Sequence, residues 1–182
     1  MFLKQKVRNK FILLRKKKYF SVNKSFFVPL IKLINKKKKK KLSLYYPSNY
    51  EENTLILFKQ LKKNNKLQTS LPIVEKNGVM KFVKWKFSDP LKVNKYGFLE
   101  PLKKNTVMSP DILIVPLLAF DRFRNRLGYG MGYYDRFIRK QVRKNRKILT
   151  IGVAFSFQKY RKIPTSKYDV KLNYILTEKG IF

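Results

Sequence analysis

The most apolar run of the chain, DILIVPLLAF at residues 111–120, most narrowly limits the folds open to this sequence. Isoleucine, leucine and valine in direct succession are typical of a strand that is buried on both faces of a parallel sheet. Pro116 has no amide hydrogen to give to a neighbouring strand, so we expect this strand to end near Val115. A strand buried on both faces needs covering layers, and it therefore favours an α/β fold.

The periodicity of the other apolar segments agrees with this fold class. It predicts helices at residues 54–64 and 133–144, and on the second helix Tyr134, Phe137, Ile138 and Val142 are expected to face inward. It predicts strands at residues 42–47, 67–74, 79–85, 147–155 and 173–177. Asn77-Gly78 is a hairpin signal between two of these strands. Residues 87–110 contain three prolines and a glycine and are expected to form a loop.

The chain is long enough for one domain, and we expect residues 1–182 to form it, with a largely parallel sheet. Residues 1–41 are a basic segment that is predicted to be helical and to pack on this domain. The lysine run at residues 36–41 is either a nucleic-acid or localisation patch or the solvated end of a helix. The second interpretation is favoured because nothing aromatic interleaves the lysines.

The chain contains neither cysteine nor histidine. Disulfides, thiol nucleophiles and thiolate metal sites are therefore excluded, as are the usual general base and the commonest metal ligand. Any chemistry must use carboxylates, lysine, arginine, tyrosine, hydroxyls, backbone amides or a bound hard cation.

The formal charge is +34, from 44 basic and 10 acidic residues. Such a charge suggests anionic partners, and a basic RNA- or ribosome-associated module without catalysis is one hypothesis. A bias toward lysine-rich composition explains the charge equally well. No apolar stretch is long enough to span a membrane, and the N-terminus lacks the pattern of a secretion signal. We expect a cytoplasmic monomer that binds no membrane and no specific nucleic acid.

The stretch RLGYGMGYYDR at residues 126–136 lies between the buried strand and the helix predicted at 133–144. Gly128, Gly130 and Gly132 permit positive φ angles and close approach of a ligand. A glycine loop that leads into a helix N-terminus presents bare amides, which suit phosphate. The loop matches neither the dinucleotide fingerprint nor the Walker pattern. It is therefore either a phosphate or nucleotide site or a turn that only lets strand and helix pack.

The segment PDILIVPLLAFDRFRNRLGYGMGYYDRF resembles the signature of the 5-formyltetrahydrofolate cyclo-ligase family. The likeness continues in LYYPSNYEENT, LPIV and GFLEP, and then in IGVAFSFQ and YDVKLNYILTEKGI, over residues 42–182. This resemblance implies a three-layer α/β/α fold. It also implies that ATP phosphorylates the formyl oxygen of 5-formyltetrahydrofolate and that N10 then closes the ring to 5,10-methenyltetrahydrofolate, with Mg²⁺ required. The partner would be a reduced folate, possibly carrying several glutamates.

The resemblance also assigns roles to individual positions. It implies catalytic roles for Arg126 and Tyr133, Mg²⁺ ligation by Asp135 and Asp169, and folate contacts at Tyr46, Glu51 and Trp85. Tyr168 stands where the family usually has a histidine before the second aspartate. The residues implied to contact ATP are Arg15, Arg126, Leu127, Gly128, Tyr129, Gly130, Met131, Gly132, Tyr133 and Tyr134.

Several of these residues also have simpler interpretations. Glu51 is suited to the N-terminal end of a helix, Asp169 to a turn, Tyr46 to packing at a strand end, and Trp85 to the core. Asp121 is expected to be structural, either orienting the glycine loop or pairing with Arg126.

Two departures from the family pattern concern the nucleotide site. The family usually has a lysine four residues before an arginine in its N-terminal helix. Arg15 fits the arginine, but position 11 is Phe, and Lys10 is displaced by about 100° around a helix. Asn125 replaces a usual glycine, and we expect it to tolerate a left-handed conformation.

Overall fold

The computed structural model describes residues 2–61, 67–102, 106–144 and 147–182. Within these residues the main sheet has the strand order β11-β10-β9-β6-β1-β2-β3. Its strands are β1 (Lys41–Ser43), β2 (Gln68–Val74), β3 (Met80–Lys84), β6 (Ile112–Val115), β9 (Leu149–Val153), β10 (Tyr174–Thr177) and β11 (Gly180–Ile181). The pairs from β2 to β10 are parallel, and the edge strands β3 and β11 are antiparallel. The predicted α/β fold with a largely parallel sheet is confirmed.

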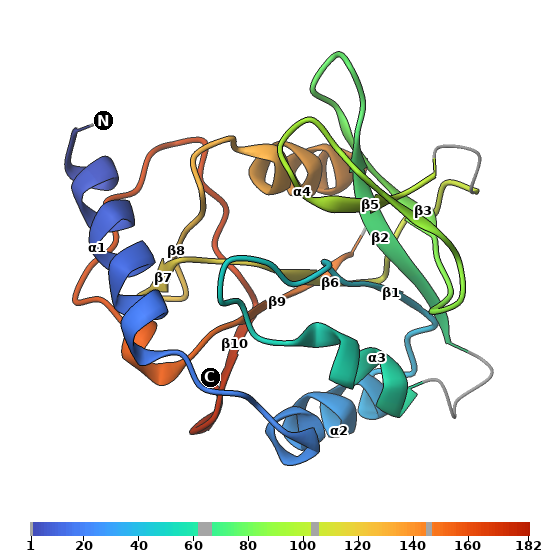
Figure 1. The fold of residues 1–182 in the computed structure, drawn as a ribbon, viewed down its shortest axis with the longest axis horizontal. Helices are drawn as coiled ribbons and strands as arrows, with labels where there is room; N and C mark the ends of the chain where they lie inside the picture. The colour runs from blue at the N-terminus through green and yellow to red at the C-terminus, as the bar shows by residue number, and fades with distance from the viewer. Residues whose placement is uncertain (1, 62–66, 103–105, 145–146) are drawn as a thin grey trace.

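Helices cover both faces of this sheet (Figure 1). The 3₁₀ turn η1 (Lys24–Phe27), α2 (Val28–Lys36) and α3 (Thr54–Leu61) lie on one side, and α4 (Tyr133–Arg143) lies on the other. The alternation along β6 explains the two layers, because successive side chains of a strand point to opposite faces. Ile112 and Ile114 join the core under α2 and α3, whereas Leu113 and Val115 join the core under α4.

Strand β6 ends before Pro116, as expected, and the chain continues into a small hairpin. In it β7 (Ala119–Phe120) pairs antiparallel with β8 (Arg126–Leu127). Helix α1 (Phe2–Lys18) lies beside this hairpin (Figure 1). Val7 and Phe11 of α1 pack with Leu127 of the hairpin in a third apolar cluster. The N-terminal helix is thereby held next to the segment that leads into the glycine loop.

Two predictions of local structure are wrong. The region expected to be loop, residues 87–110, contains β4 (Leu91–Val93) and β5 (Leu99–Pro101), which pair antiparallel across a turn with Gly97 at φ 79°. Strands of three residues are too short to show a period in the sequence. The helical segment predicted in the N-terminal region is interrupted between α1 and η1. Residues 62–64 and 103–105 lie outside the described residues.

The inward face of α4 also differs from the prediction. Phe137 and Ile138 are buried as expected, but Val142 is 59% exposed and Gln141 is buried in its place. Consecutive helical residues are separated by about 100°, and Gln141 falls on the stripe that continues from Phe137 and Ile138. Among the described residues, no helix is long and apolar enough to cross a membrane.

Candidate active site

A pocket opens at the carboxyl ends of the central parallel strands. Tyr45 and Tyr46, which follow β1, and Pro116, which follows β6, line it. This is the edge at which open α/β sheets bind their ligands. Further walls are formed by α1, by β2 and β3, by the β4–β5 hairpin and by residues 126–135, which include the glycine loop. Of the residues predicted for the site, those in the lining are Tyr46, Glu51, Arg126, Leu127, Gly128, Tyr129, Gly130, Met131, Gly132, Tyr133, Tyr134, Asp135 and Asp169.

The glycine loop supplies the backbone conformations that it was expected to need at two positions. Gly130 has φ 108°, and Gly132 has φ 65° and directly precedes the first turn of α4. Both angles lie in the region that side chains disfavour. A Cβ atom at Gly130 would also lie 3.3 Å from the guanidinium carbon of Arg8. The loop therefore brings bare backbone and the amide end of α4 to the pocket, an arrangement that suits an anion.

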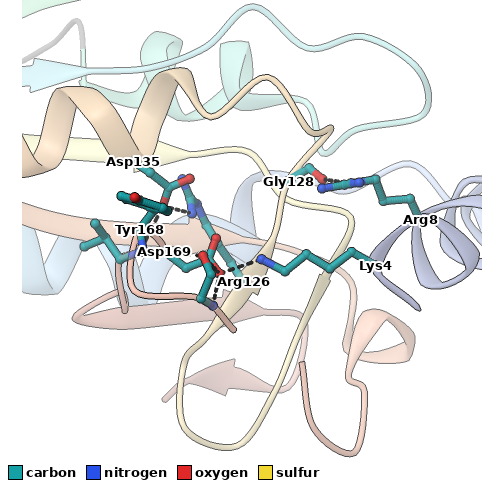
Figure 2. Close-up of polar contacts among 9 residues, drawn as sticks. Lys4, Arg8, Arg126, Gly128, Asp135, Tyr168 and Asp169 are labelled. Carbon is teal, nitrogen blue, oxygen red and sulfur yellow. Dashed lines mark hydrogen bonds and ion pairs between the residues drawn. The ribbon is translucent and has the colours of Figure 1, made fainter. Parts of the chain in front are cut away.

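Arg126 and Asp135 form an ion pair at the start of α4 (Figure 2). The Nη1 atom of Arg126 donates to Oδ1 of Asp135 at 2.9 Å, and the same oxygen accepts the amide of Val170 at 2.9 Å. Arg126 is buried, and its Nε has no hydrogen-bond acceptor among the described residues. A buried donor without a partner is costly, which sets Arg126 apart from an ordinary structural arginine.

Asp121 holds the turn between β7 and β8, and Arg126 pairs with Asp135 and not with it. Asp121 accepts hydrogen bonds from the amides of Phe123 and Asn125 at 2.9 and 3.1 Å and from the amide of Ile163 at 3.0 Å. The left-handed residue of this turn is Arg124, with φ 64°, so Asn125 does not need the left-handed conformation that it was expected to tolerate. Asn125 instead donates its side-chain amide to Asp121 at 3.0 Å.

Asp169 is held by a cation and by its own turn. Its Oδ2 accepts Lys4 Nζ at 2.5 Å and the amide of Ser166 at 2.6 Å (Figure 2). Partial burial would raise the pKa of Asp169, but the hydrogen bonds from Lys4 and Ser166 outweigh it and hold that pKa below its ordinary value. The neighbouring Tyr168, at the position of the usual family histidine, is exposed.

Lys4 and Arg8 are site residues that the sequence reasoning missed. Both line the pocket, and Arg8 Nε donates to the carbonyl of Gly128 at 3.0 Å (Figure 2). They stand four residues apart on one face of α1, which is the lysine–arginine spacing of the family pattern that position 11 and Arg15 do not provide. A search of the whole helix for a lysine four residues before an arginine would have found them.

Arg15 lies elsewhere. It is 1% exposed, and it is not among the described residues that line the pocket. Its Nη2 donates to the hydroxyl of Tyr129 at 2.6 Å. The structure therefore gives no direct access from Arg15 to a nucleotide, because the side chain is enclosed by protein.

Glu51, on the segment that follows β1, also lines the pocket and is buried. The part of the pocket around Glu51 is named the glutamate end, and the part around Asp135 and Asp169 is named the aspartate end. The Oε1 atom of Glu51 accepts the Tyr129 hydroxyl at 2.5 Å, and its Oε2 accepts the amide of Ser48 at 2.9 Å. Burial raises the pKa of Glu51, and the contacts with Tyr129, Arg15 and Ser48 partly oppose this rise. The adjacent Glu52 is also buried, and burial is the main cause that raises its pKa to about 8.

The two aromatic residues Tyr133 and Trp85, both predicted to contact ligands, lie in different places. The Tyr133 hydroxyl lies 2.8 Å from that of Tyr96 on the β4–β5 hairpin, so Tyr133 reaches the pocket. Trp85 packs in the core with its ring centroid 5.1 Å from that of Phe58, and its Nε1 donates to the carbonyl of Asp89. It is outside the described pocket lining, so the structure favours the core interpretation of Trp85.

Comparisons with known proteins place this chain among relatives of one family. The model of the 5-formyltetrahydrofolate cyclo-ligase family matches residues 3–178. The chain is 33% identical over 152 residues to a 5-formyltetrahydrofolate cyclo-ligase of Haemophilus influenzae, with 80% of each chain covered. It is 30% identical over 147 residues to that of Mycoplasma genitalium, which covers 79% of this chain and 76% of the relative.

Solved structures show the same fold. The 5,10-methenyltetrahydrofolate synthetase of Aquifex aeolicus superposes with a TM-score of 0.77 at 30% identity, covering 98% of this chain and 91% of that one. A Mycoplasma pneumoniae protein of the same name gives a TM-score of 0.72 at 24% identity and covers 95% and 97%. The match of the family model over nearly the whole chain, together with these relatives, shows that the chain belongs to the 5-formyltetrahydrofolate cyclo-ligase family of enzymes.

Proposed function

We propose that this protein converts 5-formyltetrahydrofolate to 5,10-methenyltetrahydrofolate and turns over one ATP to ADP and phosphate. The relatives are named for this activity. The observation that carries the proposal is that a single pocket collects the glycine loop, the pairs Arg126–Asp135 and Lys4–Asp169, and the buried Glu51. The RNA-associated alternative finds no support in these comparisons.

The proposed reaction needs no histidine or cysteine because the substrate provides its own nucleophiles. The formyl oxygen attacks the γ-phosphorus of ATP and ADP leaves. N10 then attacks the activated formyl carbon and loses its proton, and the C–O bond breaks with release of phosphate, which can carry that proton away. The protein has to align these groups and neutralise charge, which is the main task in phosphoryl transfer.

The nucleotide phosphates would rest on the glycine loop. Amides of the loop and of the first turn of α4 can donate to phosphate oxygens. Lys4, Arg8 and Arg126 bring three cationic side chains to the same wall of the pocket. The unpartnered Nε of Arg126 makes it the donor that we assign to the transferred phosphoryl group. Tyr133, next to Gly132, would fix the neighbouring part of the substrate through its hydroxyl.

The two aspartates fit a hard cation. Mg²⁺ is typically bound by one or two carboxylates together with phosphate oxygens. Asp135 and Asp169 offer two carboxylates in the pocket lining, and no cluster of three or more such ligands occurs in the described part of the chain. They would hold Mg²⁺ jointly with the nucleotide, and the ion would supply charge neutralisation for the phosphates.

The folate would occupy the end of the pocket that contains Glu51 and Tyr46. A buried carboxylate is a strong acceptor for the ring N–H groups of a pterin. The lining of positive side chains also suits the glutamate tail of a folate. We further propose that the enzyme acts as a cytoplasmic monomer on reduced folates that carry one or more glutamates.

An absorbance assay for 5,10-methenyltetrahydrofolate tests the function. The purified chain is mixed with 5-formyltetrahydrofolate, ATP and Mg²⁺, and product is expected only when all three are present. Phosphate release should equal product formation. Absence of product under these conditions, or product without ATP, would contradict the proposal.

A further inference from the structure

A chain of buried hydrogen bonds joins α1, the glycine loop and Glu51. Arg15 Nη2 donates to the Tyr129 oxygen at 2.6 Å, and the Tyr129 hydroxyl donates to Glu51 Oε1 at 2.5 Å. Arg15 and Glu51 are 1% and 6% exposed. Both hydrogen bonds involve a charged group, and in a buried setting such bonds strengthen one another.

Arg15 also balances the charge of this region. Glu51 and Glu52 are adjacent, both are buried, and Arg15 is the cation that acts on both of them. Its Nη1 points to the carbonyl of Leu117 at 3.4 Å, directly after Pro116 at the end of β6. A buried guanidinium is costly unless it is paired, so its position beside Tyr129 and the two glutamates indicates a defined task.

We propose that Arg15 and Tyr129 are positioning residues that fix Glu51 for the folate and couple folate binding to nucleotide binding. The inference rests on the proposed function. Tyr129 lies between Gly128 and Gly130, within the loop assigned to the phosphates. Its hydroxyl is bonded to the glutamate assigned to the pterin. A nucleotide that orders the loop also orders the acceptor of the folate, and by linkage the folate favours the nucleotide equally.

This assignment differs from a direct nucleotide contact by Arg15 or Tyr129. Arg15 is enclosed and lies outside the described pocket lining, and the hydroxyl of Tyr129 already has both a donor and an acceptor. Removing the hydroxyl should therefore affect folate affinity, while the loop amides and Arg126 continue to hold the nucleotide.

The test uses Tyr129→Phe, which deletes only the hydroxyl. Calorimetry measures the Kd of 5-formyltetrahydrofolate with and without a non-hydrolysable ATP analogue and Mg²⁺. In the wild type we expect the analogue to tighten folate binding about tenfold, within the usual range of couplings between sites. In Tyr129→Phe we expect folate binding to weaken about tenfold, and the ratio of the folate Kd without the analogue to the Kd with it to fall toward one. The Kd of the analogue alone should change less than about twofold.

Two further variants separate positioning from folding. Arg15→Met should lose the coupling, and Arg15→Lys, which retains a cationic donor, should keep part of it. If Arg15→Met does not fold, the result for Tyr129→Phe decides alone. Tyr160→Phe is the matched control, since Tyr160 packs edge-on against Phe11 of the same helix α1 with ring centroids 5.8 Å apart. It should leave every Kd unchanged.

The inference is overturned if Tyr129→Phe binds folate as the wild type does with its coupling intact. It is also overturned if folate and analogue lose affinity equally, which would make Tyr129 a direct nucleotide contact. The wild-type assay distinguishes these results from failure of the function. If the wild type binds folate and makes product, and Tyr129→Phe behaves in the same way, only this inference is refuted. If the wild type makes no product, the proposed function is refuted as well.

Discussion

The two ends of the pocket hold their carboxylates in opposite ways. At the aspartate end, Asp135 and Asp169 have side chains that are 17% and 26% exposed, and each is paired with a cation at 2.9 and 2.5 Å. At the glutamate end, Glu51 is buried and accepts a phenol hydroxyl. The pKa of Asp169 is lowered, since its hydrogen bonds outweigh its partial burial, and burial raises the pKa of Glu51.

This difference indicates a division of labour. A partly exposed carboxylate stays ionised and can exchange its lysine or arginine for another cation, such as one that arrives with a nucleotide. A buried carboxylate fixed by Tyr129 and Ser48 cannot exchange partners without leaving donors unsatisfied, so it provides a rigid acceptor. The aspartate end therefore suits Mg²⁺ and ATP, and the glutamate end suits the neutral ring system of a folate.

The largest expected effect comes from Asp135→Asn. It removes the proposed metal ligand and the partner of Arg126, and kcat/KM should fall about 10³-fold because metal-assisted charge stabilisation is worth several kcal/mol. Raising Mg²⁺ should recover part of the loss. Glu75→Gln, which removes a carboxylate paired with Lys81 away from the pocket, is the control. Wild-type turnover in Asp135→Asn would show that the aspartate end binds no essential metal.

Glu51→Gln should produce the complementary kinetic result. It removes the charge but retains the shape, and the KM for 5-formyltetrahydrofolate should rise roughly 10- to 100-fold, the range for a lost hydrogen bond to a charged group. The KM for ATP should change less than about twofold. Initial rates with each substrate varied in turn provide the measurement. An equal rise in both KM values would show that the two ends are not functionally separate.

Glu52→Gln tests whether the carboxylate beside Glu51 is desolvated, through the pH dependence of the free energy of unfolding. Glu52 has a pKa of about 8 in the fold, against 4.5 in the unfolded chain, because it is buried and lies beside Glu51. A raised pKa gives stability that is fully present below pH 4.5 and is lost as the pH rises toward 8. The permanently neutral glutamine should avoid this loss, which is on the order of a few kcal/mol.

Urea unfolding at pH 5 and pH 8 measures this effect. The free energy of unfolding of the wild type should decline between the two values more than that of Glu52→Gln. Identical declines would mean that Glu52 ionises normally and is not in a desolvated site. Glu75→Gln again serves as the control and should follow the wild type.

The smallest expected effect concerns the glycine loop. Gly132→Ala places a side chain at φ 65° and should cost about 1–2 kcal/mol of stability. Gly128→Ala is the matched variant, because its φ lies outside the left-handed region and a Cβ there has open space. Thermal unfolding should separate the two variants. Equal melting temperatures would show that the loop relaxes without strain.

The sequence was sufficient where a local pattern determines the structure. The run before Pro116 predicts β6 and its end, and the alternation along it accounts for the layers on both faces of the sheet. The sequence permits a positive φ at all three glycines of the loop, and Gly130 and Gly132 adopt one whereas Gly128 does not.

The sequence was insufficient where tertiary packing decides between equivalent positions. Arg8 and Arg15 are seven residues apart, which is about two helical turns, so they share a face of α1. Periodicity alone cannot tell which of them reaches the pocket, and the packing of α1 beside the β7–β8 hairpin selects Arg8. Trp85 follows a strand next to both the core and a loop, and only the complete fold places it against Phe58.

The most direct test of the division between the two ends is a crystal structure with Mn²⁺ in place of Mg²⁺, a non-hydrolysable ATP analogue and 5-formyltetrahydrofolate. The anomalous signal of Mn²⁺ locates the metal independently of the ligands. We predict the peak at coordination distance from Asp135 and Asp169, with Lys4 moved onto the phosphates and the pterin against Glu51. A metal bound at Glu51, or elsewhere with both aspartates still paired to Lys4 and Arg126, would contradict the account.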